Sequence, residues 1–300
     1  MKKTSIGGQA VIEGVMMKGP EDIAIAVRKP DGEITVKKEK LKSNRKKISK
    51  IPIIRGIFAF VDSMVIGVKA LSYSAEFFEE EEVKEEKKPS KLDDFMEKNM
   101  IPIAVLVSIA FSVGLFILLP TLAVSLIGTS VKTPLLMNLV EGIVRIAIFI
   151  GYIALISRMK DIKRVFEYHG AEHKSIFCYE NGEELTVENV RKYKRLHPRC
   201  GTSFLFIVMI VSILLFSLFK WPNILVRLVT RIALLPIVAG ISYEIIKWAG
   251  RSDSKLVCIV SAPGLWLQKI TTREPDDSQI EVAITALKNV LVEDKDADLW

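Results

Sequence analysis

Four long apolar stretches constrain this chain more than any other feature. Residues 101–127 carry no charged side chain, and residues 139–157, 203–219 and 224–246 are also strongly apolar. A helix of about 20 apolar residues crosses the hydrocarbon core of a bilayer, so 203–219 is at the short end. The chain is 50% hydrophobic yet 26% charged, because the two kinds of residue are separated along it. We predict an α-helical multi-pass membrane protein with about four transmembrane helices.

Lysine and arginine are distributed unevenly between the connecting segments. Residues 158–202 hold ten of them, whereas 128–138 and 220–223 hold one each. The positive-inside rule therefore predicts a cytoplasmic location for 158–202 and, with four spans, for both termini. The basic run 37–50 supports a cytoplasmic location for the N-terminus by the same rule. We expect no cleaved signal peptide, because no apolar run opens the chain.

The net charge of +7 comes from this excess beside the membrane. We expect it to attract anionic lipid headgroups, so that membrane lipids are partners. Nucleic acid is not an expected partner, because no aromatic residues are interleaved with the basic run.

We divide the chain into segments by composition and hydropathy. The predicted segments are a cytoplasmic β-rich unit (1–50), an interfacial or buried apolar helix (51–78), a charged linker (79–100), a first transmembrane pair (101–157), a cytoplasmic helical loop (158–202), a second transmembrane pair (203–247), and an interfacial segment with a C-terminal amphipathic helix (248–300).

The N-terminal unit reads as a small sheet. Residues 9–17 form one extended run, and strands over 23–28 and 33–36 flank Pro30-Asp31-Gly32, a hairpin turn signal. Glu13 interrupts the first run. It is either a solvent-facing strand position or a carboxylate of a functional site.

Residues 51–75 form an apolar helix with one narrow polar stripe, since Arg55, Asp62 and Lys69 recur every seven residues. We expect it to lie half-sunk at the cytoplasmic interface or to pack against the spans, because Asp62 makes a lipid-exposed crossing costly.

Two further segments follow the last span. Residues 256–268 are apolar but broken by Pro263-Gly264, so they are expected in the interface or as a re-entrant segment. Residues 278–291 are an amphipathic helix with a Ser278/Glu281 capping box. Its apolar stripe is Ile280, Ile284, Leu287 and Leu291.

Four charged residues fall inside the predicted spans. Glu141 and Arg145 are one helical turn apart in the second span, and Arg227 and Arg231 are one turn apart in the fourth. Charges in lipid are costly unless they face inward and pair, so we predict an internal polar cluster. It either stabilises the bundle or lines a path for a substrate or an ion.

All three histidines of the chain fall between positions 169 and 197. His169, Glu172 and His173 form an H-x-x-E-H pattern, which places both histidines on one helical face. His197 and Cys200 lie three residues apart farther on. Nitrogen and sulfur ligands in this mixture are typical of zinc, so His169, His173, His197 and Cys200 are the predicted metal ligands. Gly170 is expected to weaken the helix that carries the two histidines.

Three cysteines in a protein whose soluble parts are cytoplasmic argue against structural disulfides. Cys178, Cys200 and Cys258 are expected to be free thiols, core residues or metal ligands.

Several sequence blocks resemble the signature blocks of the YqhQ family of bacterial membrane proteins. These blocks are residues 7–17, 168–174, 197–204 and 271–275. The resemblance extends over nearly the whole chain. It implies the bacterial cytoplasmic membrane and a metal site, since the family is described as predicted metal-dependent enzymes without an established reaction. It implies no substrate.

Three functional hypotheses remain open. In the first, His169, His173 and either His197 or Cys200 hold Zn²⁺ with one open position, and Glu172 is the catalytic general base of a hydrolase acting on membrane protein or lipid. In the second, four ligands form a closed structural site in a non-enzymatic assembly or quality-control partner of other membrane proteins. In the third, Cys200 is a nucleophile with a histidine base.

Overall fold

The computed structural model describes residues 4–41, 51–78, 91–127, 134–198, 200–219, 223–251 and 254–292. Residues 42–50 of the predicted basic run and 79–90 of the predicted charged linker lie outside this part. The chain forms two compact units. The first comprises Met1–Phe77, Tyr152–Ser212 and Leu234–Trp300, and the second comprises Phe78–Gly151 and Ile213–Ala233.

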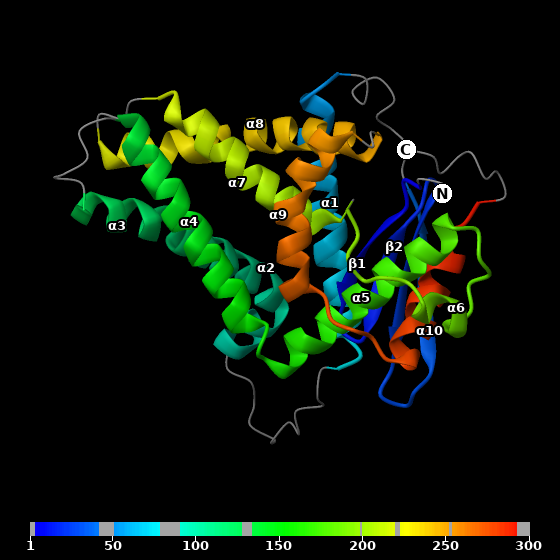
Figure 1. Ribbon diagram of the computed structural model, residues 1–300. Coiled ribbons are helices and arrows are strands. Elements are labelled where there is room, and N and C mark those ends of the chain that lie inside the picture. The colour runs from blue at the N-terminus through cyan, green and yellow to red at the C-terminus, as the bar shows by residue number, and fades with distance from the viewer. Residues whose placement is uncertain are drawn as a thin grey trace. The chain divides into compact units, whose positions relative to one another are not determined.

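Four strands and ten α-helices are described, with a short π-helix between two of the helices (Figure 1). The strands are β1 (Gly7–Val11), β2 (Gly14–Lys18), β3 (Asp22–Arg28) and β4 (Ile34–Lys40). The helices are α1 (Ile54–Ala75), α2 (Lys91–Val113), the π-helix η2 (Gly114–Leu118), α3 (Leu119–Ile127), α4 (Pro134–Ile156), α5 (Lys160–Glu180), α6 (Val187–Arg191), α7 (Gly201–Ser217), α8 (Ile224–Arg251), α9 (Lys255–Thr271) and α10 (Asp277–Lys288).

The N-terminal strands form an antiparallel sheet in the order β1-β2-β3-β4. The predicted hairpin at Pro30-Asp31-Gly32 is confirmed, and Gly32 adopts a positive φ of 88° there. The single extended run predicted over 9–17 is wrong. The chain reverses between β1 and β2, and Val11 pairs with Gly14. Glu13 in this turn has a positive φ of 48°, so the apolar residues on both sides belong to two strands rather than one.

Helices α5 and α10 pack on this sheet and complete the core of the first unit (Figure 1). Three members of the apolar stripe predicted for the C-terminal helix, Ile280, Ile284 and Leu287, are buried in α10. The fourth, Leu291, lies after the end of the helix and is partly buried against the same core. The predicted cap is wrong by two residues. Asp276 is the N-cap, and it exchanges hydrogen bonds with Gln279 in a capping box.

Helix α1 packs against α8 and against the sheet, which is one of the two arrangements predicted for it. Arg55 forms an ion pair with Glu244 of α8, and Gly67 lies against the side chain of Gln9. Large apolar side chains remain exposed along α1: Phe60, Val61, Met64, Val65 and Leu71.

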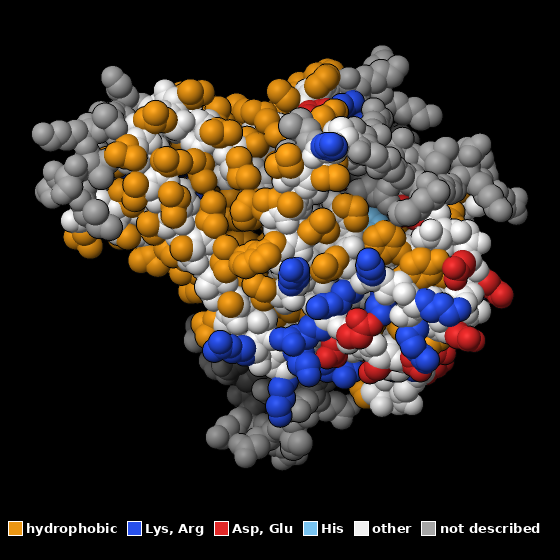
Figure 2. Space-filling view, viewed as in Figure 1, with side chains coloured by type: hydrophobic (Ala, Val, Ile, Leu, Met, Phe, Trp, Pro, Cys, Tyr) orange, Lys and Arg blue, Asp and Glu red, His pale blue; other side chains and the backbone are white. Residues whose placement is uncertain are grey.

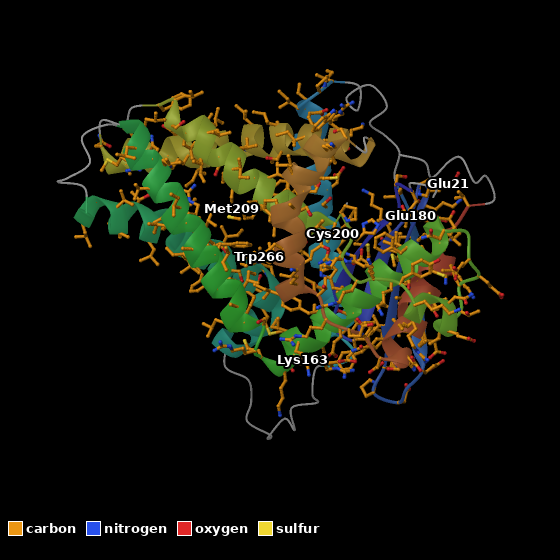
Figure 3. All side chains as sticks on the ribbon, viewed as in Figure 1. Glu21, Lys163, Glu180, Cys200, Met209 and Trp266 are labelled. Carbon is orange, nitrogen blue, oxygen red and sulfur yellow. The ribbon has the colours of Figure 1, made fainter. Side chains whose placement is uncertain are left out.

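Helix α9 runs without a break through Pro263, so the interruption predicted at Pro263-Gly264 is wrong. Gly264 instead allows close packing, because a Cβ there would contact the side chain of Ser203 in α7. Trp266 on α9 is exposed (Figure 3).

Three described helices are long and apolar enough to cross a membrane: Pro102–Leu126, Leu135–Ile156 and Leu225–Gly250. The third predicted span, 203–219, corresponds to the 17-residue apolar helix Gly201–Ser217, which is shorter. At 1.5 Å per residue it extends roughly 25 Å, slightly less than a hydrocarbon core of about 30 Å. A count of four spans therefore stays a prediction. Figure 2 shows apolar side chains over these helices and Lys and Arg side chains gathered near α5.

The predicted internal pairing of Glu141 with arginines is confirmed within the second unit. Glu141 forms ion pairs with Arg145, Arg227 and Arg231.

Candidate metal centre

Helix α5 carries three of the predicted site residues. It is continuous from Lys160 to Glu180, and the imidazole rings of His169 and His173 lie 4.4 Å apart, centroid to centroid. Gly170 does not interrupt it. A Cβ at this position would overlap the carbonyl oxygen of Arg273, so glycine allows the segment after α9 to lie directly on α5. The weakening of α5 expected from the low helix propensity of glycine is outweighed by the contact with Arg273 that glycine allows.

Three candidate ligand atoms converge at one point. His169, His173 and Cys200 each offer one ligand atom, and these atoms lie within 4.8 Å of one another. Nε2 of His169 is 3.1 Å from Sγ of Cys200. Cys200 lies directly before α7 (Figure 3). The arrangement therefore joins α5 to the beginning of an apolar helix.

Backbone carbonyls determine which nitrogen of each imidazole faces the cluster. Nδ1 of His169 donates to the carbonyl oxygen of Thr271 at 2.8 Å, and Nδ1 of His173 donates to that of Arg195 at 2.5 Å. Because a carbonyl oxygen only accepts, both rings carry a proton on Nδ1, and Nε2 of each ring is the nitrogen that faces the cluster. Metal-binding histidines are commonly oriented in this way.

Nε2 of His173 is buried and makes no hydrogen bond within the described part of the chain. A buried nitrogen without a partner costs free energy, and such atoms are rare in folded proteins. A metal ion between this nitrogen, Nε2 of His169 and the Cys200 sulfur would satisfy it. The residues therefore fit a metal with a preference for nitrogen and sulfur.

The cluster holds Cys200 near its thiolate form. Burial raises the pKa of the thiol, but His173 and His169 outweigh it, so that this pKa lies well below its ordinary value. Burial lowers the pKa of His169, yet the adjacent Cys200 raises it overall to about 9. The backbone N–H and the hydroxyl of Thr202 also donate to the sulfur, at 3.4 and 3.3 Å. Hydrogen bonds of this kind stabilise a thiolate.

Glu172 lies beside this group rather than in it. Its side chain is buried, and the backbone N–H of Gly8 in β1 hydrogen-bonds to it. Burial raises the pKa of Glu172, and the nearby His173 and His169 lower it only in part. A Cβ on Gly8 would contact the Glu172 side chain at 2.9 Å, so this glycine allows the carboxylate to approach the strand. The carboxyl group is thus able to hold a proton at a higher pH than an ordinary glutamate.

The structure places His197 outside the three-residue group. Its Nε2 lies 3.5 Å from a carboxylate oxygen of Glu180, and its ring packs on Phe177. The side chain of Gln268 binds both the backbone N–H and the carbonyl of His197, each at 2.8 Å. Figure 3 marks Glu180 near the end of α5. The backbone of His197, held by Gln268, therefore anchors the segment that delivers Cys200.

Glu13 contributes to neither of the roles expected for it. Arg164 of α5 binds its two carboxylate oxygens, and the hydroxyl of Tyr168 donates to it at 3.2 Å. These contacts attach the turn between β1 and β2 to α5.

Sequence reasoning did not find the groups that orient the ligands, namely the carbonyls of Arg195 and Thr271 and the side chains of Thr202 and Gln268. A backbone carbonyl has no residue signature. The blocks 197–204 and 271–275 contain Thr202 and Thr271, and they are the signal that could have pointed to these two groups. All four sequence blocks that carry the family resemblance meet at this site, through Gly8, the α5 residues, Cys200 and Thr271.

Comparisons with known proteins identify the family. The family model described as "Protein of unknown function (DUF1385)" matches residues 51–293. The chain belongs to this family. A curated DUF1385 relative, "Uncharacterized protein YqhQ" of Bacillus subtilis (strain 168), is 38% identical over 294 residues, which is 95% of this chain and 92% of the relative. The resemblance to the YqhQ family is thereby confirmed. No solved structure matches the chain.

Proposed function

We propose that this DUF1385 protein binds one zinc ion through His169, His173 and Cys200 at the cytoplasmic face of the bacterial cell membrane, and that it hydrolyses a membrane protein or lipid there. One observation carries the proposal. Two imidazoles are held by backbone carbonyls with Nε2 toward a sulfur, and Nε2 of His173 has no hydrogen bond in the described structure. Two nitrogen ligands and one sulfur ligand favour zinc.

The ligand count supports a catalytic site over a closed one. Structural zinc sites have four protein ligands, whereas catalytic sites have three and an open position. His197, the predicted fourth ligand, faces Glu180 instead. A bound zinc ion would supply Lewis-acid chemistry and lower the pKa of a water molecule. Glu172, with its raised pKa, would accept a proton from the attacking water and return it to the leaving group.

The packing of the first unit supports the proposed topology. The N-terminal sheet, α5 and α10 share one core, so they lie on the same side of a membrane. An even number of crossings must then separate the sheet from α5, and α5 from α10. If α2–α3 and α4 each cross once, two crossings separate the sheet from α5. If α7 and α8 each cross once, two crossings separate α5 from α10. The ten Lys and Arg residues of 158–202 favour the cytoplasmic side.

Elemental analysis of detergent-purified protein tests the metal. Wild type should hold about one zinc ion per chain, and His173→Ala should lose it. His197→Gln is the matched control, because it changes a buried histidine outside the group and should retain the metal. Equal metal content in wild type and His173→Ala would exclude the site, while loss in His197→Gln as well would favour a four-ligand structural site.

Glu172→Gln tests the catalytic role, because an amide cannot take the proton. The variant should keep its zinc and its melting temperature but lose the protein's function in cells. Cobalt-substituted protein gives a separate readout. Added azide should change its visible spectrum if a coordination position is open. A metal-loaded, fully functional Glu172→Gln protein would rule out the hydrolase and leave a scaffold that binds other membrane proteins.

The contact between Cys200 and His169 supports a second candidate, a thiol enzyme. Their 3.1 Å separation and the lowered pKa of Cys200 suit a thiolate nucleophile with a histidine partner. This reading leaves Nε2 of His173 unsatisfied, so we favour it less. It requires that metal-free protein be active and that Cys200→Ser abolish activity.

A further inference from the structure

The second unit buries more positive than negative charge among its apolar helices. Glu141 is the only acidic residue in 101–151 and 213–233. The side chains of Arg145, Arg227 and Arg231 pair with it, and all four side chains are at least 88% buried. Three guanidinium groups facing one carboxylate leave a formal surplus of two positive charges. Such a surplus inside apolar surroundings is costly.

Glu141 has no remaining capacity to neutralise this surplus. Its Oε1 accepts from Arg145 at 3.1 Å, from Thr121 at 2.9 Å and from Arg231. Its Oε2 accepts from Arg227 and from a second nitrogen of Arg231 at 3.1 Å. A carboxylate has about four lone-pair positions, and five donors already share them.

Donor groups of two arginines remain available. Nε of Arg227 and Nε of Arg231 are buried and make no hydrogen bond in the described structure. Arg231 as a whole is only 2% exposed. Oδ1 of Asn138 accepts from both arginines only at 3.4 and 3.5 Å. The hydroxyl of Thr121 accepts from a terminal nitrogen of Arg231 at 3.1 Å and supplies no negative charge. The ring of Phe216 lies 5.3 Å from the Arg231 guanidinium, a contact that offsets part of the cost but supplies no negative charge.

We propose that the guanidinium cluster of Arg145, Arg227 and Arg231 binds a phosphate group. Phosphate offers several acceptor oxygens and the negative charge that the cluster lacks, and the planar fork of arginine matches its geometry. Carboxylate ligands would supply less charge and fewer acceptors. This site is built from residues of the second unit alone and does not depend on the metal centre.

Two of the three arginines lie near the start of their helix, where a phosphate can reach them, whereas Arg145 follows Leu135 by ten positions and lies about 15 Å inside its span. Arg227 and Arg231 follow Leu225, the first residue of that candidate span, by two and six positions, and Glu141 follows Leu135 by six. At 1.5 Å per residue these positions are about 3 to 9 Å inside the span. The headgroup of an anionic lipid and a phosphate group from the aqueous side both come within range.

The full-length protein in two environments distinguishes the two sources. In phosphatidylcholine nanodiscs containing phosphatidylglycerol, native mass spectrometry counts the phosphatidylglycerol retained by each chain. In a maltoside detergent, which carries no phosphate group, thermal unfolding is followed while inorganic phosphate replaces chloride at constant ionic strength. Retention in the first arm assigns a lipid headgroup, and stabilisation in the second assigns a soluble phosphate. Each result supports the site.

Arg227→Gln should weaken whichever response the wild type shows by about tenfold or more, as expected for one lost charge-assisted hydrogen bond. Arg158→Gln is the matched control, because Arg158 is exposed and lies outside the cluster. It should leave the response unchanged. Arg227→Lys keeps the positive charge, and with it the ion pair with Glu141, but removes the planar guanidinium group. We expect this variant to lose part of the response, less than Arg227→Gln loses. Equal responses in all four proteins, or no response in either arm, would overturn the proposal.

Discussion

Replacing Gly170 by alanine tests whether the close contact between α5 and the segment after α9 holds the candidate metal centre together. Helix propensity alone favours alanine by about 1 kcal/mol. The added Cβ would overlap the carbonyl oxygen of Arg273, which is backbone and cannot rotate away. Arg273 is also attached to α5 by a hydrogen bond from its N–H to the carbonyl of Phe166, at 2.8 Å. Overpacking of this kind costs about 1 to 3 kcal/mol and sometimes more.

The overpacking cost less the gain in helix propensity leaves a decrease in the free energy of unfolding of up to about 2 kcal/mol for Gly170→Ala. Gly151→Ala is the matched control. Gly151 is also within a helix, but no atom lies within 4 Å of its added Cβ, so this variant should be neutral or stabilised by up to about 1 kcal/mol. Thermal melting of both variants in the same detergent measures the difference.

In Gly170→Ala the segment after α9 must move away from α5, and this movement should weaken metal binding. The carbonyl of Thr271, which orients His169, is two residues from Arg273 in the segment that must move. Loss of such an orienting contact typically lowers metal affinity by about 10- to 100-fold. Competition with a chromophoric zinc chelator measures it. If Gly170→Ala melts like Gly151→Ala and binds zinc like wild type, the close contact does not support the site and the reasoning is wrong.

Three other outcomes are expected. Asp276→Ala should cost about 1 kcal/mol as a lost helix cap. Burial raises the pKa of Asp276, but hydrogen bonds from Ser278 and Gln279 lower it overall. The part of the cap that depends on the carboxylate charge should therefore be present above about pH 4 and be lost as the pH falls; an unchanged penalty at pH 2 would contradict this. Burial raises the pKa of Cys178 to about 11, so its alkylation in folded protein should increase with pH up to that value rather than level off near 9. A cysteine introduced at position 183 should resist membrane-impermeant maleimide in intact cells, and labelling there would overturn the proposed topology.

Local pattern determined much of the architecture. Apolar runs of membrane-spanning length predicted the candidate spans, and the 3.6-residue period predicted α10 and the shared face of His169 and His173. The H-x-x-E-H spacing lies within one helix, so its geometry follows from helical rise and turn alone. The pairing of Glu141 with arginines followed from the cost of charge in an apolar setting. For the spans and the helical faces, neighbouring residues in the sequence carry the whole signal. The pairing of Glu141 with Arg227 and Arg231 joins residues 86 and 90 positions apart, so it followed from the energetic argument and not from a local pattern.

Tertiary packing decided the rest. His197 and Cys200 were equivalent candidates in the sequence, yet a turn in which the Cys200 N–H bonds to the His197 carbonyl separates their side chains. Gln268 then holds His197 in place from α9, far along the chain. In the sequence Gly170 indicates a weakened helix, and only the structure shows that the Arg273 backbone packs against it. The ligand set depends on contacts between segments about 30 to 100 residues apart, and no local period or propensity encodes which of those segments meet.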